Sequence, residues 1–103
     1  MLRLRKPVTY VILRRAGWRD ADDLREAAER STREGDAMAD EVRWIRSYVL
    51  AEPDGSVGTV CIYQGVDEDA VRRHAGKAGL PVDEVVPVAD TVVVRPDPQP
   101  AAV

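Results

Sequence analysis

The sequence has very little of the chemistry that usually indicates a function. Its 103 residues include a single cysteine, Cys61, and a single histidine, His74. One cysteine cannot form an internal disulfide, so nothing in the sequence points to an oxidising compartment. One cysteine and one histidine also fall short of the four ligands that a structural zinc site needs. The glycine-rich phosphate-binding motifs, HExxH and GxSxG are absent.

Long apolar runs and a surplus of positive charge are missing as well. No stretch approaches the roughly 20 apolar residues needed to cross a bilayer. The basic start, residues 1–7, is not followed by an apolar run long enough for a secretory signal. The net charge of −3 argues against a general nucleic-acid binder, which must neutralise phosphates with cations. We therefore expect a cytoplasmic protein with no membrane and no nucleic-acid partner.

The composition is that of one folded domain. With 45% hydrophobic and 32% charged residues, the chain differs from intrinsically disordered sequences. We expect a single domain over residues 1–95 and a Pro-rich disordered tail over residues 96–103. Arginine outnumbers lysine, 13 to 2, which is typical of a GC-rich bacterial genome. An exposed arginine in this chain therefore needs no functional reason.

The first half of the chain predicts a strand followed by a helix. The β-branched and aromatic run over residues 8–14 is typical of a strand buried on both faces, and Gly17 is expected to end it. Asp20 stands at a helix N-cap, and small or apolar residues recur every three or four positions after it. Gly35 either stops this helix or lies on its inward face within a helix that continues to about residue 39. The phase of the periodicity favours the longer helix.

The second half predicts a hairpin, a helix and a last strand. Alternation over residues 42–50 and 58–64, with turn residues at 52–56, is typical of an antiparallel pair. A capped, alanine-rich helix follows. The extended run over residues 85–95 contains Pro87, which cannot donate to a sheet and belongs at an edge or a break. The β-α-β-β-α-β order predicts a ferredoxin-like α+β fold, with two helices on one face of a four-stranded antiparallel sheet.

The other face of this sheet is where we expect a ligand or a partner. Aliphatic hairpin residues suit the helix side, which leaves the open face to Trp44, Arg46, Tyr48, Cys61 and Tyr63. Such a surface is too apolar to be stable in water. It predicts a dimer interface, a pocket, or both. In a pocket the aromatic rings would stack on a small-molecule ligand and Arg46 would bind an anionic group.

His74 lies on the predicted inward stripe of the second helix, an unusual place for a polar ring. Either a backbone carbonyl satisfies it, or it serves as a metal ligand or general base. Cys61 is most simply a small buried hydrophobic residue. The predicted faces place Cys61 and His74 apart, which disfavours a Cys–His nucleophile pair.

Three motifs carry a family resemblance. They are Trp-x-x-Ser-Tyr-Val over residues 44–49, Cys-x-Tyr over residues 61–63 and His-Ala-x-x-Ala-Gly-x-Pro over residues 74–81. In order and spacing they resemble a small bacterial family named for a nickel-responsive, nickel-binding protein and also described as a domain of unknown function. The resemblance implies a ferredoxin-like fold, a homodimer and a nickel site. Cys61 and His74 match the family and would be the metal ligands.

Two positions depart from the family pattern. The family has a histidine where this chain has Arg46 and a glutamate where it has Gln64. The exchange removes two metal donors and adds a positive charge, while nickel needs more than two donors. We therefore expect binding of nickel, or of another divalent transition metal, to be weakened or lost. If a metal binds, His74 and Cys61 would hold it, with acidic residues or a second subunit completing the site.

The alternative hypothesis is a small-molecule biosynthetic enzyme of the cyclase, isomerase or monooxygenase type, by analogy of fold alone. In that case Arg46 would hold an anionic or phenolic substrate and His74 would be the catalytic acid or base. The pocket would be lined by Trp44, Tyr48 and Tyr63. A third hypothesis is an interaction module with no ligand.

Overall fold

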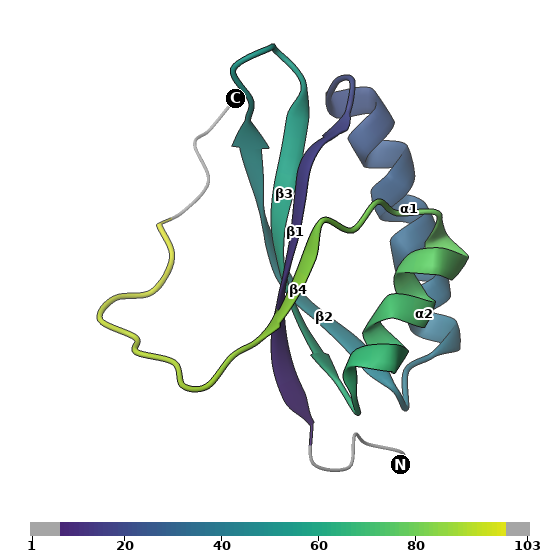
Figure 1. The fold of residues 1–103 in the computed structure, drawn as a ribbon, viewed down its shortest axis with the longest axis vertical. Coiled ribbons are helices and arrows are strands. Elements are labelled where there is room, and N and C mark those ends of the chain that lie inside the picture. The colour runs from purple at the N-terminus through teal and green to yellow at the C-terminus, as the bar shows by residue number, and fades with distance from the viewer. Residues whose placement is uncertain (1–6, 99–103) are drawn as a thin grey trace.

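The computed structural model describes residues 7–98, which form one antiparallel sheet with two helices on one of its faces (Figure 1). The strands lie in the order β2-β3-β1-β4. This arrangement confirms the predicted ferredoxin-like βαββαβ fold. The elements, in chain order, are β1 (Val8–Trp18), α1 (Ala21–Ala37), β2 (Val42–Ala51), β3 (Val57–Gly65), α2 (Glu68–Ala78) and β4 (Glu84–Pro87).

Both helices begin and end as local sequence signals predict. The carboxylates of Asp20 and Asp67 each accept a hydrogen bond from the backbone N–H three residues later, at 3.0 and 2.8 Å. α1 continues through Gly35, which confirms the longer of the two predicted helices. α2 ends at Gly79, whose φ of 68° is the left-handed conformation that glycine adopts without strain. In residues 7–98 no helix is long and apolar enough to span a membrane.

β1 is longer than predicted. Gly17 does not end it, because the strand continues to Trp18 through an irregularity in its pairing with β3 after Arg14. Ala16 has a φ of 47° within this irregularity. Its N–H donates to the carboxylate of Glu52, which also binds the side chain of Arg15. The glycine therefore marks a bulge held by the β2–β3 turn.

The last strand is shorter than predicted. β4 covers Glu84–Pro87, so only residues 85–87 of the run expected over residues 85–95 are in the strand, and it lies at the sheet edge, as Pro87 requires. Val88 makes one more backbone bond, to Thr9, at 2.8 Å. Residues 89–98 then run over the face opposite the helices (Figure 1). The predicted tail over residues 96–103 lies partly outside the described residues.

The core consists of large side chains on the sheet packed against helices whose buried residues are mostly small, with Val71 and His74 of α2 as the larger ones. Tyr10, Ile12 and Tyr63 are buried on the helix side of the sheet. Small residues of the helices leave room for these rings and branched chains, as packing at native density requires. The buried helix residues include Ala27, Ser31, Ala70, Ala75 and Ala78.

The prediction for the faces of the hairpin is wrong for three of its five residues. Trp44, Cys61 and Tyr63 lie on the helix side, whereas Arg46 and Tyr48 lie on the open face as predicted. One cause is a register shift between Trp44 and Arg46, which breaks the alternation of β2. The other cause is the small size of the buried helix side chains. They leave space above the sheet, and aromatic and thiol side chains of the sheet occupy it.

Candidate functional site

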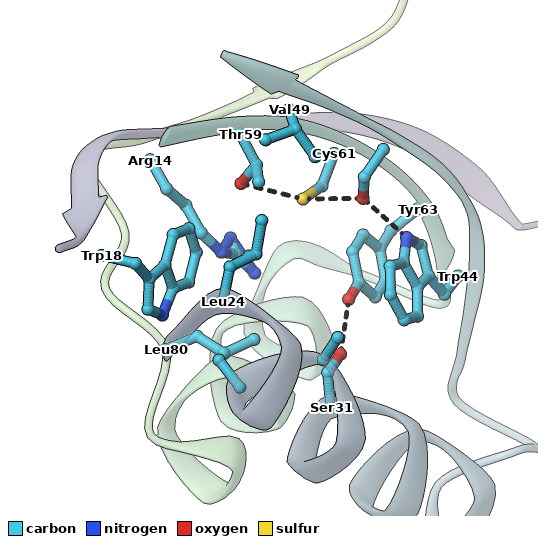
Figure 2. A pocket seen from close by; sticks show the side chains of 13 residues that line it. Arg14, Trp18, Leu24, Ser31, Trp44, Val49, Thr59, Cys61, Tyr63 and Leu80 are labelled. Carbon is cyan, nitrogen blue, oxygen red and sulfur yellow. Dashed lines mark hydrogen bonds between the residues drawn. The ribbon is translucent and has the colours of Figure 1, made fainter. Parts of the chain in front are cut away.

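A cavity of about 270 Å³ lies between the hairpin, the end of β1 and helix α1 (Figure 2). Its walls are mostly apolar, and its polar groups come almost entirely from the sheet. The side chains that determine its chemistry are Arg14 of β1, Trp44 of β2, and Cys61 and Tyr63 of β3. The cavity is therefore built by the helix-facing side of the sheet and not by the open face.

Arg14 is the most unusual residue of this cavity. Its side chain is only 1% exposed, and its Nη1 and Nη2 atoms have no hydrogen-bond partner within residues 7–98. Figure 2 shows its guanidinium extending into the cavity. A buried charge without a partner is costly, because the loss of hydration is not compensated. This makes Arg14 the strongest candidate for a group that meets a ligand.

The sequence reasoning missed Arg14, although a signal for it was present. In a strand, residues two apart share a face. Arg14 therefore shares the face of Tyr10 and Ile12, and all three side chains are buried. An arginine that continues a buried apolar face is the pattern that could have singled it out.

Tyr63 forms the aromatic end of the cavity. Its hydroxyl and that of Ser31 are 2.9 Å apart and share a hydrogen bond. Its ring is stacked on Trp44, with centroids 6.1 Å apart, and lies 5.4 Å from the ring of His74. Burial raises the pKa of Tyr63, and the hydrogen bond with Ser31, the charge of Arg14 and the proximity of its guanidinium only partly offset this effect. The phenol therefore stays neutral at neutral pH and can act as a hydrogen-bond donor.

Cys61 belongs to a chain of hydrogen bonds that crosses the roof of the cavity (Figure 2). Trp44 Nε1 donates to Ser47 Oγ at 2.8 Å, and Ser47 Oγ donates to Cys61 Sγ at 3.0 Å. The thiol in turn donates to Thr59 Oγ1 at 3.3 Å. Its sulfur is thus held between two hydroxyl groups, one from Ser47 and one from Thr59.

His74 is buried under α1 and does not line the cavity. Its Nε2 lies 2.9 Å from the carbonyl oxygen of Ser31. This contact agrees with the first of the two predicted roles, a histidine satisfied by a backbone carbonyl. A carbonyl only accepts, so Nε2 carries the proton. Nδ1 has no partner in the described part of the chain.

Arg46 and Tyr48, the other predicted ligand-binding residues, lie across the sheet from this cavity. Arg46 Nη1 is 2.6 Å from an oxygen of Asp97, and the Tyr48 hydroxyl donates to the same carboxylate at 2.9 Å. The pocket predicted from Arg46, Tyr48, Tyr63 and His74 together is therefore not formed. The first two residues share the open face with residues 88–93, and the last two are under the helices.

The residues present do not fit a nickel site within one chain. Among residues 7–98, no group of three His, Cys, Asp or Glu side chains is close enough to hold a metal ion. Cys61 and His74 lie on the helix side of the sheet, while Arg46 and Gln64 line the open face. The four positions that the resemblance connects with a metal are thus divided between two faces.

Comparison with known proteins identifies the family. The family model described as "Nickel responsive protein SCO4226-like" matches residues 10–88, which include every helix and all but the ends of the sheet. No curated protein and no solved structure matches the chain. With most of its folded part covered by this match, the chain belongs to the SCO4226-like family of nickel-responsive proteins.

Proposed function

We propose that this chain is a homodimeric, non-catalytic binding protein of the nickel-responsive family in which nickel binding is weakened or lost. The observation that supports the proposal most strongly is that no three His, Cys, Asp or Glu side chains among residues 7–98 are close enough together to hold a metal ion. Cys61 and His74 are on one side of the sheet, and the two positions that depart from the family pattern, Arg46 and Gln64, are on the other. One metal ion cannot be held from both sides of a sheet.

The donors under the helices are also engaged in other bonds. Cys61 would have to give up the hydrogen bond that its thiol donates to Thr59 to bind a metal as a thiolate. His74 uses Nε2 for the carbonyl of Ser31, which leaves only Nδ1 for a metal. A single imidazole does not provide the donor set that nickel prefers.

On the open face, a cation replaces a donor. Arg46 presents a guanidinium where the family has an imidazole, and it forms an ion pair with Asp97. Gln64 offers only a neutral amide oxygen in place of a carboxylate. Both changes disfavour a second positive charge at this surface, because like charges repel and a weaker donor binds less tightly.

Titration calorimetry with Ni²⁺ on the full chain, stripped of metal with a chelator, tests this part of the proposal. We expect no tight, saturable heat for the natural sequence. The double variant Arg46→His, Gln64→Glu restores the family donors on the open face and is expected to gain affinity. Tight binding by the natural sequence that disappears in His74→Gln would overturn the proposal.

The apolar open face supports the homodimer. Ile45 and Tyr48 are more than a third exposed there, and Val92, Val93 and Val94 on the segment beside them are 75–85% exposed. Contiguous apolar surface of this kind usually marks an interface. We propose that a second copy of the chain covers it, with the two open faces opposed.

Light scattering after size-exclusion chromatography tests the dimer. We expect the mass of two chains for the natural sequence, and a shift towards one chain for Val93→Asp, which places a charge in the apolar segment. Ala39→Asp is a matched control, because it adds the same charge at an exposed residue next to the end of α1. A natural chain that is monomeric at high concentration would contradict the proposed dimer.

A further inference from the structure

The unpartnered guanidinium of Arg14 points to a ligand of opposite charge. None of the salt bridges within residues 7–98 includes Arg14. The nearby carboxylate of Glu52 is already bound to Nε and Nη2 of Arg15, at 2.9 and 2.7 Å, and to the N–H of Ala16. Arg14 is thus a positive charge buried beside an apolar cavity, and its two terminal nitrogens, themselves almost fully buried, have no hydrogen-bond partner in residues 7–98.

We propose that this cavity is a binding site for a small organic carboxylate, held by Arg14. The two free nitrogens, Nη1 and Nη2, lie in one plane at the spacing of the two oxygens of a carboxylate. A bidentate pair would neutralise the buried charge and satisfy both donors at once. Of the four positions that the resemblance connects with a metal, only Cys61 lines this cavity, and the proposed contact with the carboxylate is made by Arg14 alone.

The apolar walls of the cavity favour a carboxylate whose remaining part is apolar. Trp18, Leu24 and Leu80 surround the guanidinium end of the cavity (Figure 2), and the stacked rings of Trp44 and Tyr63 form the other end. A volume of about 270 Å³ is slightly below the ~300 Å³ at which drug-sized sites begin. A single-ring aromatic acid or a short branched aliphatic acid fits this size and polarity.

The cavity is accessible from solvent at strand β2. Trp44 is 39% exposed and Val49 is 59% exposed, and both line the cavity. We expect a ligand to enter beside these two side chains, carboxylate first, and to meet the Arg14 nitrogens once the side chains that cover them move aside. Tyr63, which is buried between Trp44 and His74, would then contact the ring or chain of the ligand.

Arg46 serves as an internal comparison. It also comes from the sheet, but its guanidinium is half exposed and is paired with Asp97 at 2.6 Å. Its charge is already paired with a carboxylate, and it lies on the other face of the sheet, so we expect it to bind no ligand in this cavity. Arg46→Met is consequently a matched control for Arg14→Met, since both remove one arginine from the sheet.

Calorimetric titration of the full chain with benzoate, 4-hydroxybenzoate and isovalerate tests the proposal. We expect saturable binding of at least one of these acids by the natural sequence and by Arg46→Met, and none by Arg14→Met. Arg14→Lys keeps the charge but loses the bidentate geometry, so it should bind about tenfold more weakly or worse. Circular dichroism confirms that each variant is folded before titration.

Two further probes separate a carboxylate site from other sources of binding. Benzamide has the shape of benzoate without its charge, and inorganic phosphate has charge without an apolar body; we expect neither to bind comparably. The proposal is overturned if none of the three acids binds, if benzamide or phosphate binds as tightly, or if Arg14→Met binds as the natural sequence does. If Arg14→Met does not fold, the Arg14→Lys result decides in the same way.

Discussion

Replacing Arg14 with methionine should stabilise the ligand-free protein. Methionine is shorter than arginine but unbranched, flexible and uncharged, so the change removes the buried guanidinium and retains the packing of the part of the side chain nearer the backbone. Replacing buried ionic groups by apolar ones of similar volume is neutral or stabilising by about 1–4 kcal/mol. Arg14 has no salt-bridge partner in residues 7–98 that the substitution would strand. We therefore expect a gain of about 2 kcal/mol in the free energy of unfolding.

This gain is large enough to measure by thermal unfolding. For a domain of about this size, 1 kcal/mol shifts Tm by about 4–8 °C, so about 2 kcal/mol predicts a rise of about 8–16 °C. The assay is differential scanning calorimetry on protein refolded from denaturant, which removes any ligand carried through purification. Arg72→Met is the control, and its Tm should change little because its ion pair with Glu68 on α2 is exposed to solvent. A folded Arg14→Met variant whose Tm falls by several degrees would refute the reasoning, since the guanidinium would then be making stabilising contacts.

Three more substitutions test the packing and charges around the cavity. Tyr63→Phe leaves the buried hydroxyl of Ser31 without its partner and should cost about 1–3 kcal/mol in urea unfolding. Gly58→Ala places a Cβ 2.7 Å from the carboxylate of Glu52 and against the backbone of β1, so we expect a loss of about 1–3 kcal/mol or more. The hydrogen bond from Arg15, and then that from the backbone of Ala16, lower the pKa of Glu52. Its stabilising effect is therefore present above the ordinary glutamate pKa and is lost as the pH falls through the lower folded value, and Glu52→Gln should flatten this acid-side decline.

Each of these predictions has an outcome that contradicts it. Unchanged urea unfolding of Tyr63→Phe would mean that the bond to Ser31 contributes nothing. Gly76→Ala is the control for Gly58→Ala, because a Cβ at Gly76 meets nothing within 4 Å; equal stability of the two variants would contradict the predicted clash. If Glu52→Gln loses stability on acidification as steeply as the natural sequence does, the ion pair with Arg15 is not the source of the pH dependence.

The elements of the fold could be predicted because their signals are local. Asp20 and Asp67 cap helices through bonds that reach only three residues along the chain. The left-handed turn at Gly79 and the edge position of Pro87 follow from the backbone chemistry of those residues alone. The βαββαβ order then leaves few ways to arrange the sheet.

The site could not be predicted in the same way because it depends on which face each strand residue takes. A shift in the pairing after Trp44 reverses the alternation of β2, and no turn residue announces it. Which residues of β3 face the helices depends on the small residues of α1 and α2, because these leave enough room for Tyr63 and Cys61 under the helices. Hydrophobicity alone assigns the aliphatic residues to the core, and this places Tyr63 and Cys61 on the wrong face.

The burial of Arg14 could not be predicted for a different reason. The run over residues 8–14 contains so many apolar residues that it is typical of a strand buried on both faces, and alternation within it carries no weight. The structure shows that one face, with Tyr10, Ile12 and Arg14, is much more deeply buried than the other. Because the chain is rich in arginine, a single arginine is also a weak indication of a functional site.

The most direct measurement is the NMR signal of the Arg14 side chain, observed through its Nε–H group in protein labelled with ¹⁵N-arginine and assigned with Arg14→Lys. We predict that benzoate shifts this signal to saturation and that Ni²⁺ leaves it unchanged, because the buried guanidinium meets an anion and the metal has no donor set beside it. If benzoate does not shift the Arg14 signal, and Ni²⁺ shifts the signals of His74 and Cys61 to saturation, the assignment of this cavity to an organic anion is contradicted.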